Sequence, residues 1–164
     1  MKQIMTAAFM YASDNDDFMA PSNGYSRNLY NFLTGTESVG ARYIQPNSNL
    51  FDCPTEITKR KLTCGNYAAR ADSSASNPHP KMKLNRMNQN FIYLSEISPE
   101  GYATRGNVRW FYNNAQLPPA SGYWAVTLRH SSKVNAGRIN GTVTSMLEFE
   151  FKEAKNFVLL TTDL

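Results

Sequence analysis

The sequence predicts an α+β domain in which a helical first third precedes a series of antiparallel strands. Three observations favour this class: apolar residues at helical spacing near the start, a high content of strand-forming aromatics (nine Tyr, nine Phe and two Trp) and a hairpin signal at Asn140-Gly141. A chain of 164 residues is long enough to bury one substantial core. We therefore expect a single domain over residues 1–164.

The segment 1–13 has two neighbouring apolar stripes with helical spacing. The first consists of Ile4, Ala7, Ala8 and Tyr11, and the second of Met5, Phe9 and Ala12. A helix that is apolar over so much of its circumference is usually buried against something. No capping residue precedes the pattern. We therefore expect the back half of a longer helix, whose front half precedes Met1.

A second helical pattern places Tyr25, Leu29, Phe32 and Leu33 on one face and ends at Gly35, a residue typical of helix C-termini. Residues 46–80 are expected to form loops with short strands. The strands predicted after them cover 90–97, 107–113, 122–130, 136–139, 142–147 and 156–162, all rich in β-branched and aromatic residues. Asn140-Gly141 predicts a two-residue type I′ turn with positive φ at both positions.

Charge and hydropathy exclude several classes of protein. The net charge of +4 is small and the Lys and Arg residues are scattered, so no nucleic-acid partner is expected. The given residues contain no stretch of eighteen apolar residues and no signal peptide. P-loop, dinucleotide-binding, HExxH and G-x-S-x-G motifs are also missing from the sequence. We therefore do not expect an enzyme.

Two groups of residues suggest a cross-link or a ligand. Cys53 and Cys64 lie eleven positions apart, without the spacing of a zinc motif, and predict a disulfide worth about 3 kcal/mol; two unrelated thiols are the alternative. Asp14, Asp16 and Asp17 follow the first helix. They are a weak calcium candidate, because no EF-hand glycine or terminal glutamate follows, and a solvated helix end is the favoured interpretation.

His130 is the residue most suggestive of chemistry. Ser131 follows it directly, but neighbours on a strand point to opposite faces, which places Ser131 badly for activation. We expect the imidazole to bond a backbone carbonyl near the turn and so to hold the loop. A hydrolase would instead require His130 to be hydrogen-bonded to a carboxylate and to face a cleft.

These residues together carry a resemblance. "MKQIMTAAFMYASDNDDFMAP" resembles the segment after the membrane helix of pilin-like proteins, and His130 followed by nine residues and Asn140-Gly141 is similar to the H-X9-DG element of prepilin-type proteins. "LFDCPTE", with Cys53-Pro54, resembles the F-x-C-P stretch of that family, and "YLSEI", with Glu96, a strand that ends in an acidic residue. The chain departs from the family at Asn140, where Asp is usual. The substitution puts any role of a carboxylate there in doubt.

The resemblance implies a pilin-like fold, with the N-terminal helix packed on an antiparallel sheet and extra loops. It implies a pseudopilin-like structural subunit of a type II secretion system or a type IV pilus-like assembly, with a prepilin-type cleavage and methylation signal upstream. Its partners would be other pilin-like subunits, the secretion machinery, and exported protein or polysaccharide. A missing N-terminal helix would anchor it in the inner membrane, with the head in the periplasm or in a cell-surface filament. The expected assembly surface is the face formed by Ile4, Ala7, Ala8 and Tyr11.

The alternative function belongs to a different class. A strand-rich extracellular domain with exposed aromatic side chains is typical of a carbohydrate-binding module. The stacking residues would be Trp110, Tyr112, Tyr123 and Trp124. Aromatic residues in strands more often pack within a core or on a sheet face, so the pilin-like interpretation is preferred.

Overall fold

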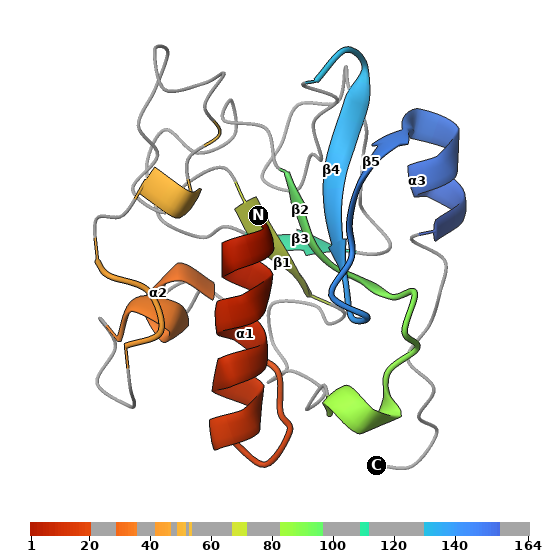
Figure 1. Ribbon diagram of the computed structural model, residues 1–164. Helices are drawn as coiled ribbons and strands as arrows, with labels where there is room; N and C mark the ends of the chain where they lie inside the picture. The colour runs from red at the N-terminus through yellow and green to blue at the C-terminus, as the bar shows by residue number, and fades with distance from the viewer. Residues whose placement is uncertain are drawn as a thin grey trace.

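The computed structural model consists of a five-stranded sheet with helices packed around it (Figure 1). It describes residues 1–20, 29–35, 42–46, 49–51, 53, 67–71, 83–96, 109–111 and 130–154. The helices are α1 (Lys2–Asp14), α2 (Leu29–Thr34), α3 (Glu148–Ala154) and the short 3-10 helices η1 (Asn49–Phe51) and η2 (Leu84–Arg86). The strands are β1 (Tyr67–Ala71), β2 (Ile92–Glu96), β3 (Arg109–Phe111), β4 (Lys133–Arg138) and β5 (Val143–Leu147).

The strands are arranged in the order β3-β1-β2-β4-β5. The pairs β1/β2, β2/β4 and β4/β5 are antiparallel, and the α+β class predicted from the sequence is confirmed. The expectation of a purely antiparallel sheet is wrong at one edge, because β1 and β3 run parallel. The predicted strand 156–162 lies outside the described residues, as does the predicted strand 122–130 except for His130, which lies in the turn before β4.

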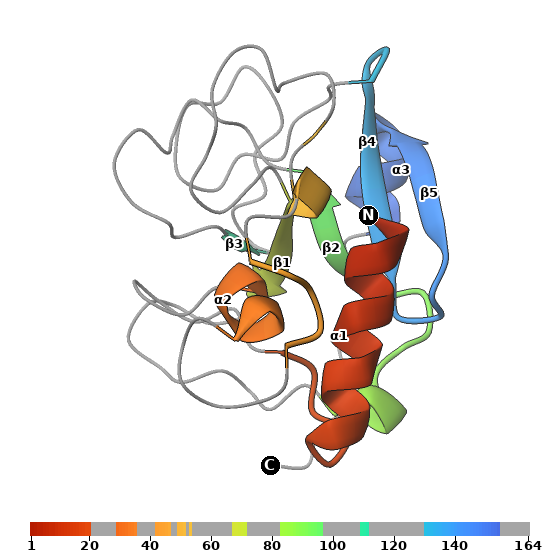
Figure 2. The same ribbon diagram turned by 60° about the vertical axis from the view of Figure 1, so that its left-hand side comes forward.

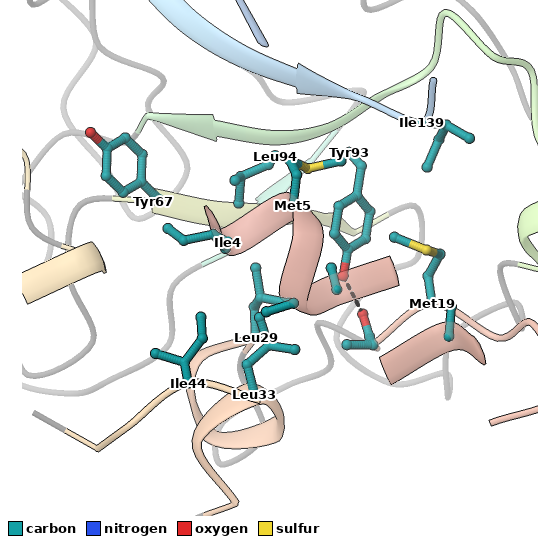
Figure 3. Packing of buried hydrophobic residues seen from close by; sticks show 14 of the residues in the cluster. Ile4, Met5, Met19, Leu29, Leu33, Ile44, Tyr67, Tyr93, Leu94 and Ile139 are labelled. Carbon is teal, nitrogen blue, oxygen red and sulfur yellow. Dashed lines mark hydrogen bonds between the residues drawn. The ribbon is translucent and has the colours of Figure 1, made fainter. Parts of the chain in front are cut away.

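Helix α1 lies across one face of the sheet, with α2 beside it (Figure 2). Three of its five core side chains are alanines and one is the flexible Met5, which allows a close approach to the strands (Figure 3). The helix also has a polar side, on which Lys2, Gln3, Thr6 and Ser13 are exposed. The completely or almost completely buried residues of α1 are Ile4, Met5, Ala7, Ala8 and Ala12.

An irregularity in β2 determines which side chains face α1. The register of β2 against β4 shifts between Ile92 and Leu94. As a result, Tyr93 and Leu94 both belong to the core under α1, and the Tyr93 hydroxyl donates a 2.7 Å hydrogen bond to the Ala20 carbonyl (Figure 3). Regular alternation then returns Glu96 to the α1 face.

The opposite face of β4 has its own buried residues. Alternation along the strand places Val134 and Ala136 on the side away from Asn135 and Gly137. Helix α3, which directly follows β5, packs back against β4 and β5 and buries Phe151. Its sequence, "EFEFKEA", alternates like a strand, and no helix was expected there.

The type I′ turn predicted between β4 and β5 is found instead at the other end of β4, before its first residue. Gly141 has φ 82°, but Asn140 does not have positive φ, and the bonds Gly141 N–Arg138 O and Arg138 N–Thr142 O close a three-residue loop. The predicted type I′ turn at Asn140-Gly141 is therefore wrong; the glycine instead occupies the left-handed position of a three-residue hairpin. The type I′ pattern occurs before β4, where Ser131 and Ser132 have φ 53° and 61°.

The ends of the first two helices follow their sequence signals. Asn15 donates from its side chain to the Tyr11 carbonyl, and the backbone N–H of Asp17 bonds the Ala12 carbonyl. These bonds satisfy carbonyls at the end of α1. Gly35, with φ 66°, follows α2 as predicted.

Candidate functional site

Three of the segments that carry the family resemblance meet at one cluster of side chains. His130 Nε2 lies 2.8 Å from Glu96 Oε1 and 3.4 Å from Cys53 Sγ. The three donor atoms all lie within 4.8 Å of one another, although Cys53 and His130 are 77 positions apart. Among the described residues this is the group of His, Cys and carboxylate side chains that could hold a metal ion.

Each member of the cluster is positioned by a different element. Cys53 follows η1 and is completely buried, and Glu96 is the last residue of β2. His130 precedes β4 and is held there by two backbone bonds with Lys133, His130 N–Lys133 O (3.2 Å) and Lys133 N–His130 O (3.1 Å). The tight turn at Ser131-Ser132 therefore directs the imidazole back toward the sheet.

Glu96 is the centre of the polar network. Its Oε2 accepts a 3.0 Å bond from the backbone N–H of Asn135, and its Oε1 accepts a 3.1 Å bond from the Asn135 side-chain amide. The Glu96 side chain has no solvent exposure, whereas that of His130 is 29% exposed. A buried carboxylate requires such partners, because burying an unpaired charge costs several kcal/mol.

The geometry does not match a catalytic relay. A nucleophile–His–acid arrangement uses both ring nitrogens, one toward the nucleophile and one toward the acid. Here the Cys53 thiol and the Glu96 carboxylate approach the same atom, Nε2. The cluster can share a proton at Nε2 or hold an ion there, but it does not align a thiolate with a base oriented by a carboxylate.

The expected role of His130 is corrected by this arrangement. Among the described residues, its side chain contacts the Glu96 carboxylate and the Cys53 thiol, and no backbone carbonyl of the kind that the sequence suggested. Asn140 stabilises the loop at the other end of the segment that begins at His130. Its Oδ1 accepts hydrogen bonds from Thr142 N (3.0 Å) and Thr142 Oγ1 (2.7 Å). A carboxylate would accept the same bonds, so the role of this side chain here does not depend on the difference between Asn and Asp.

The predicted assembly face of α1 has another role in the structure. Ile4, Ala7 and Ala8 are buried in the core of the domain, and Tyr11 makes edge-to-face contacts with Phe32 and Tyr43. Ile4, Ala7 and Ala8 are therefore covered by the chain itself, whereas Tyr11 is partly buried.

The weak calcium candidate is not supported by the arrangement of its aspartates. Asp14 accepts a 2.9 Å hydrogen bond from the Tyr43 hydroxyl, while Asp16 and Asp17 have φ 52° and 65° in the turn after α1. Within the described ranges, the three carboxylates do not converge as a metal-ligand group.

Other sequence predictions fall on residues that the structure does not describe. Cys64 is one of these, so the disulfide with Cys53 stays a prediction. The candidates for carbohydrate stacking also stay predictions. Tyr112, Tyr123 and Trp124 lie outside the described ranges, as does the side chain of Trp110 in β3.

Local sequence patterns neither indicated Asn135 nor brought Cys53 and Glu96 together with His130. Local motifs could not reveal this site, because its members are separated by tens of residues and no metal-binding spacing connects them. The available signal was the resemblance itself, whose F-x-C-P, YLSEI and H-X9-DG segments contain these side chains.

None of the helices in the described part of the chain is long and apolar enough to cross a membrane. Comparisons with protein-family models, with curated proteins and with solved structures find no significant match.

Proposed function

We propose that this chain is the head of a pseudopilin-like structural subunit of a type II secretion or type IV pilus-like assembly. One observation carries the proposal: the segments that resemble the family are in mutual contact. Cys53 and Glu96 meet at His130, and Met5 of α1 lies against Gly137 within the H-X9-DG element. Segments that belong to one common architecture are expected to contact one another in this way.

The arrangement of α1 supports a role in assembly. Its apolar face is seated on the sheet, which leaves its opposite, polar side exposed. In the proposed subunit, an upstream apolar half-helix continues α1 into the inner membrane and later into the filament core, while the sheet remains outside.

The side of α1 opposite the sheet is the surface available to neighbouring subunits. Met10 is 53% exposed on this side, close to the polar residues Gln3 and Thr6. In the proposed assembly this surface faces another copy of α1 or the machinery that extracts subunits from the membrane.

The intact mass of the native protein in the membrane fraction of its source cells tests the proposal. A membrane-spanning segment of about 20 residues adds about 2 kDa or more to the 18.5 kDa of the given residues. A heavier, membrane-retained species with a methylated N-terminus is the expected result. A native species of 18.5 kDa that begins at Met1 and does not associate with membranes or filaments would contradict it.

A cross-linking experiment tests the surface directly. In a Cys64→Ser background, Met10→Cys on α1 should form cross-links between subunits in cells, whereas Glu153→Cys, exposed on α3, should not. Equal cross-linking at both positions would indicate random collision and would contradict the use of α1.

A further inference from the structure

We propose that Cys53, Glu96 and His130 form a binding site for a divalent transition-metal ion of the zinc class. The inference rests on the convergence of three different donor types, thiol, carboxylate and imidazole, from three separate segments. It is independent of the proposed role in a filament.

The three donor atoms lie within 4.8 Å of one another, and one of their separations already equals that around a tetrahedral ion. With Zn–N and Zn–O distances of about 2.0 Å and a Zn–S distance of about 2.3 Å, neighbouring donor atoms lie about 3.3–3.6 Å apart. The separation of Cys53 Sγ and His130 Nε2, 3.4 Å, is already in this range. The 2.8 Å separation of Nε2 from Glu96 Oε1 is that of a hydrogen bond, and must widen by about 0.5 Å when an ion replaces the shared proton.

The surroundings hold the carboxylate in place for such a role. Asn135 donates to both oxygens of Glu96, through its backbone N–H to Oε2 and its side-chain amide to Oε1. Ligating carboxylates are usually oriented by hydrogen bonds of this kind, and the loss of such partners weakens metal binding about 10- to 100-fold. Asn135 is therefore a positioning residue of the site.

Burial and donor chemistry define the ion. Cys53 and Glu96 are fully buried, while the partly exposed His130 leaves a route from solvent. A soft thiolate combined with imidazole suits Zn²⁺ or Co²⁺ rather than Ca²⁺ or Mg²⁺, which prefer oxygen donors. Three protein ligands leave the fourth tetrahedral position to water. The bound ion would tie the segment after η1 to β2 and to the turn before β4.

Cobalt titration of the full chain tests the proposal. A Cys64→Ser background keeps the Cys53 thiol from pairing with Cys64, and Co²⁺ binding is followed by thiolate-to-cobalt charge transfer and by the visible bands of tetrahedral cobalt. We expect one Co²⁺ per chain, displaced by Zn²⁺. Cys53→Ser should abolish the charge-transfer band, and His130→Gln and Asn135→Ala should each weaken binding about tenfold or more.

The second histidine supplies a matched control, because His79→Gln should leave binding unchanged. Circular dichroism of each variant separates lost ligands from lost folding, and the partly exposed His130 is the site least prone to unfold the domain when substituted. The proposal is overturned if the folded Cys64→Ser protein binds no cobalt, if bound cobalt shows no thiolate band, or if His130→Gln binds as well as His79→Gln.

Discussion

Met5 of α1 occupies the space that a side chain at Gly137 of β4 would need. A Cβ built on Gly137 would lie 2.8 Å from both Cγ and Sδ of Met5, and 3.3 Å from Leu94 Cβ. The close approach of the first helix to the sheet therefore depends on the missing side chain at this position.

Gly137→Ala should lower the free energy of unfolding by about 1–3 kcal/mol, because the added methyl overpacks the contact with Met5. Chemical denaturation measures the change, and a double-mutant cycle with Met5→Ala identifies its cause. In the Met5→Ala background the alanine at position 137 should cost much less. An equal cost in both backgrounds would show that Met5 is not the obstacle.

Glu96→Gln should destabilise the domain by about 1–3 kcal/mol. The side chain is fully buried and accepts bonds from His130 and Asn135, so a neutral amide leaves at least one donor poorly paired. Glu153→Gln, at an exposed position of α3, is the matched control and should change stability by less than about 0.5 kcal/mol. Similar values for the two variants, measured by urea denaturation, would contradict the importance of this network.

The turn before β4 should tolerate glycine better than the native serine. Ser132 has φ 61°, a conformation that is costly for a residue with a Cβ, so Ser132→Gly is expected to raise the free energy of unfolding by about 0.5–1 kcal/mol. The same change at Ser145, an exposed position within β5, should instead destabilise the domain. Thermal melts of both variants compare these opposite signs.

Asn140 should be replaceable by Asp but not by Ala. Its Oδ1 accepts bonds from the backbone N–H and the hydroxyl of Thr142, and a carboxylate can accept both. Asn140→Asp is expected to remain within about 0.5 kcal/mol of the native protein, whereas Asn140→Ala should lose about 1 kcal/mol. An equally destabilised Asp variant, in denaturant titrations at neutral pH, would indicate a role specific to the amide.

Tyr93 should make the domain sensitive to alkaline pH. Burial raises the pKa of its hydroxyl well above the ordinary value of 10.0, so the unfolded chain loses this proton first. The contribution to stability is complete below pH 10 and is lost progressively as pH rises above it. The free energy of unfolding, measured from pH 8 to pH 11, should therefore fall at the alkaline end.

Tyr93→Phe separates this effect from the titration of surface lysines. The variant loses the bond to the Ala20 carbonyl and about 1 kcal/mol at neutral pH. Its stability should then decline less steeply above pH 10 than that of the native protein. Parallel curves for the two proteins would show that Tyr93 is not the titrating group.

Local patterns were sufficient to predict much of the secondary structure. The apolar spacing around Ile4 and Ala8 predicts α1, and Gly35 correctly indicates the end of α2, because both depend on interactions within a few residues. The strand enrichment of 90–97 and the hairpin at Asn140-Gly141 likewise locate β2, β4 and β5. The α+β class follows from the order of these elements alone.

The features decided by tertiary contacts are those that connect distant parts of the chain. The apolar stripe of α1 indicates burial but not its partner, and the structure shows that the partner is the domain's own sheet. Similarly, Ser131-Ser132 carries no strong turn signal, yet both residues adopt positive φ, because the backbone bonds between His130 and Lys133 close a tight turn there.

The candidate site shows most clearly the difference between what local sequence patterns predict and what tertiary contacts decide. The sequence by itself determined only that Cys53, Glu96 and His130 lie in the segments that carry the resemblance. Only the folded sheet brings their donor atoms together around His130 Nε2 and adds Asn135 as a partner of the carboxylate. The physical reason is that their contacts join segments tens of residues apart, whereas sequence periodicity records only interactions between near neighbours.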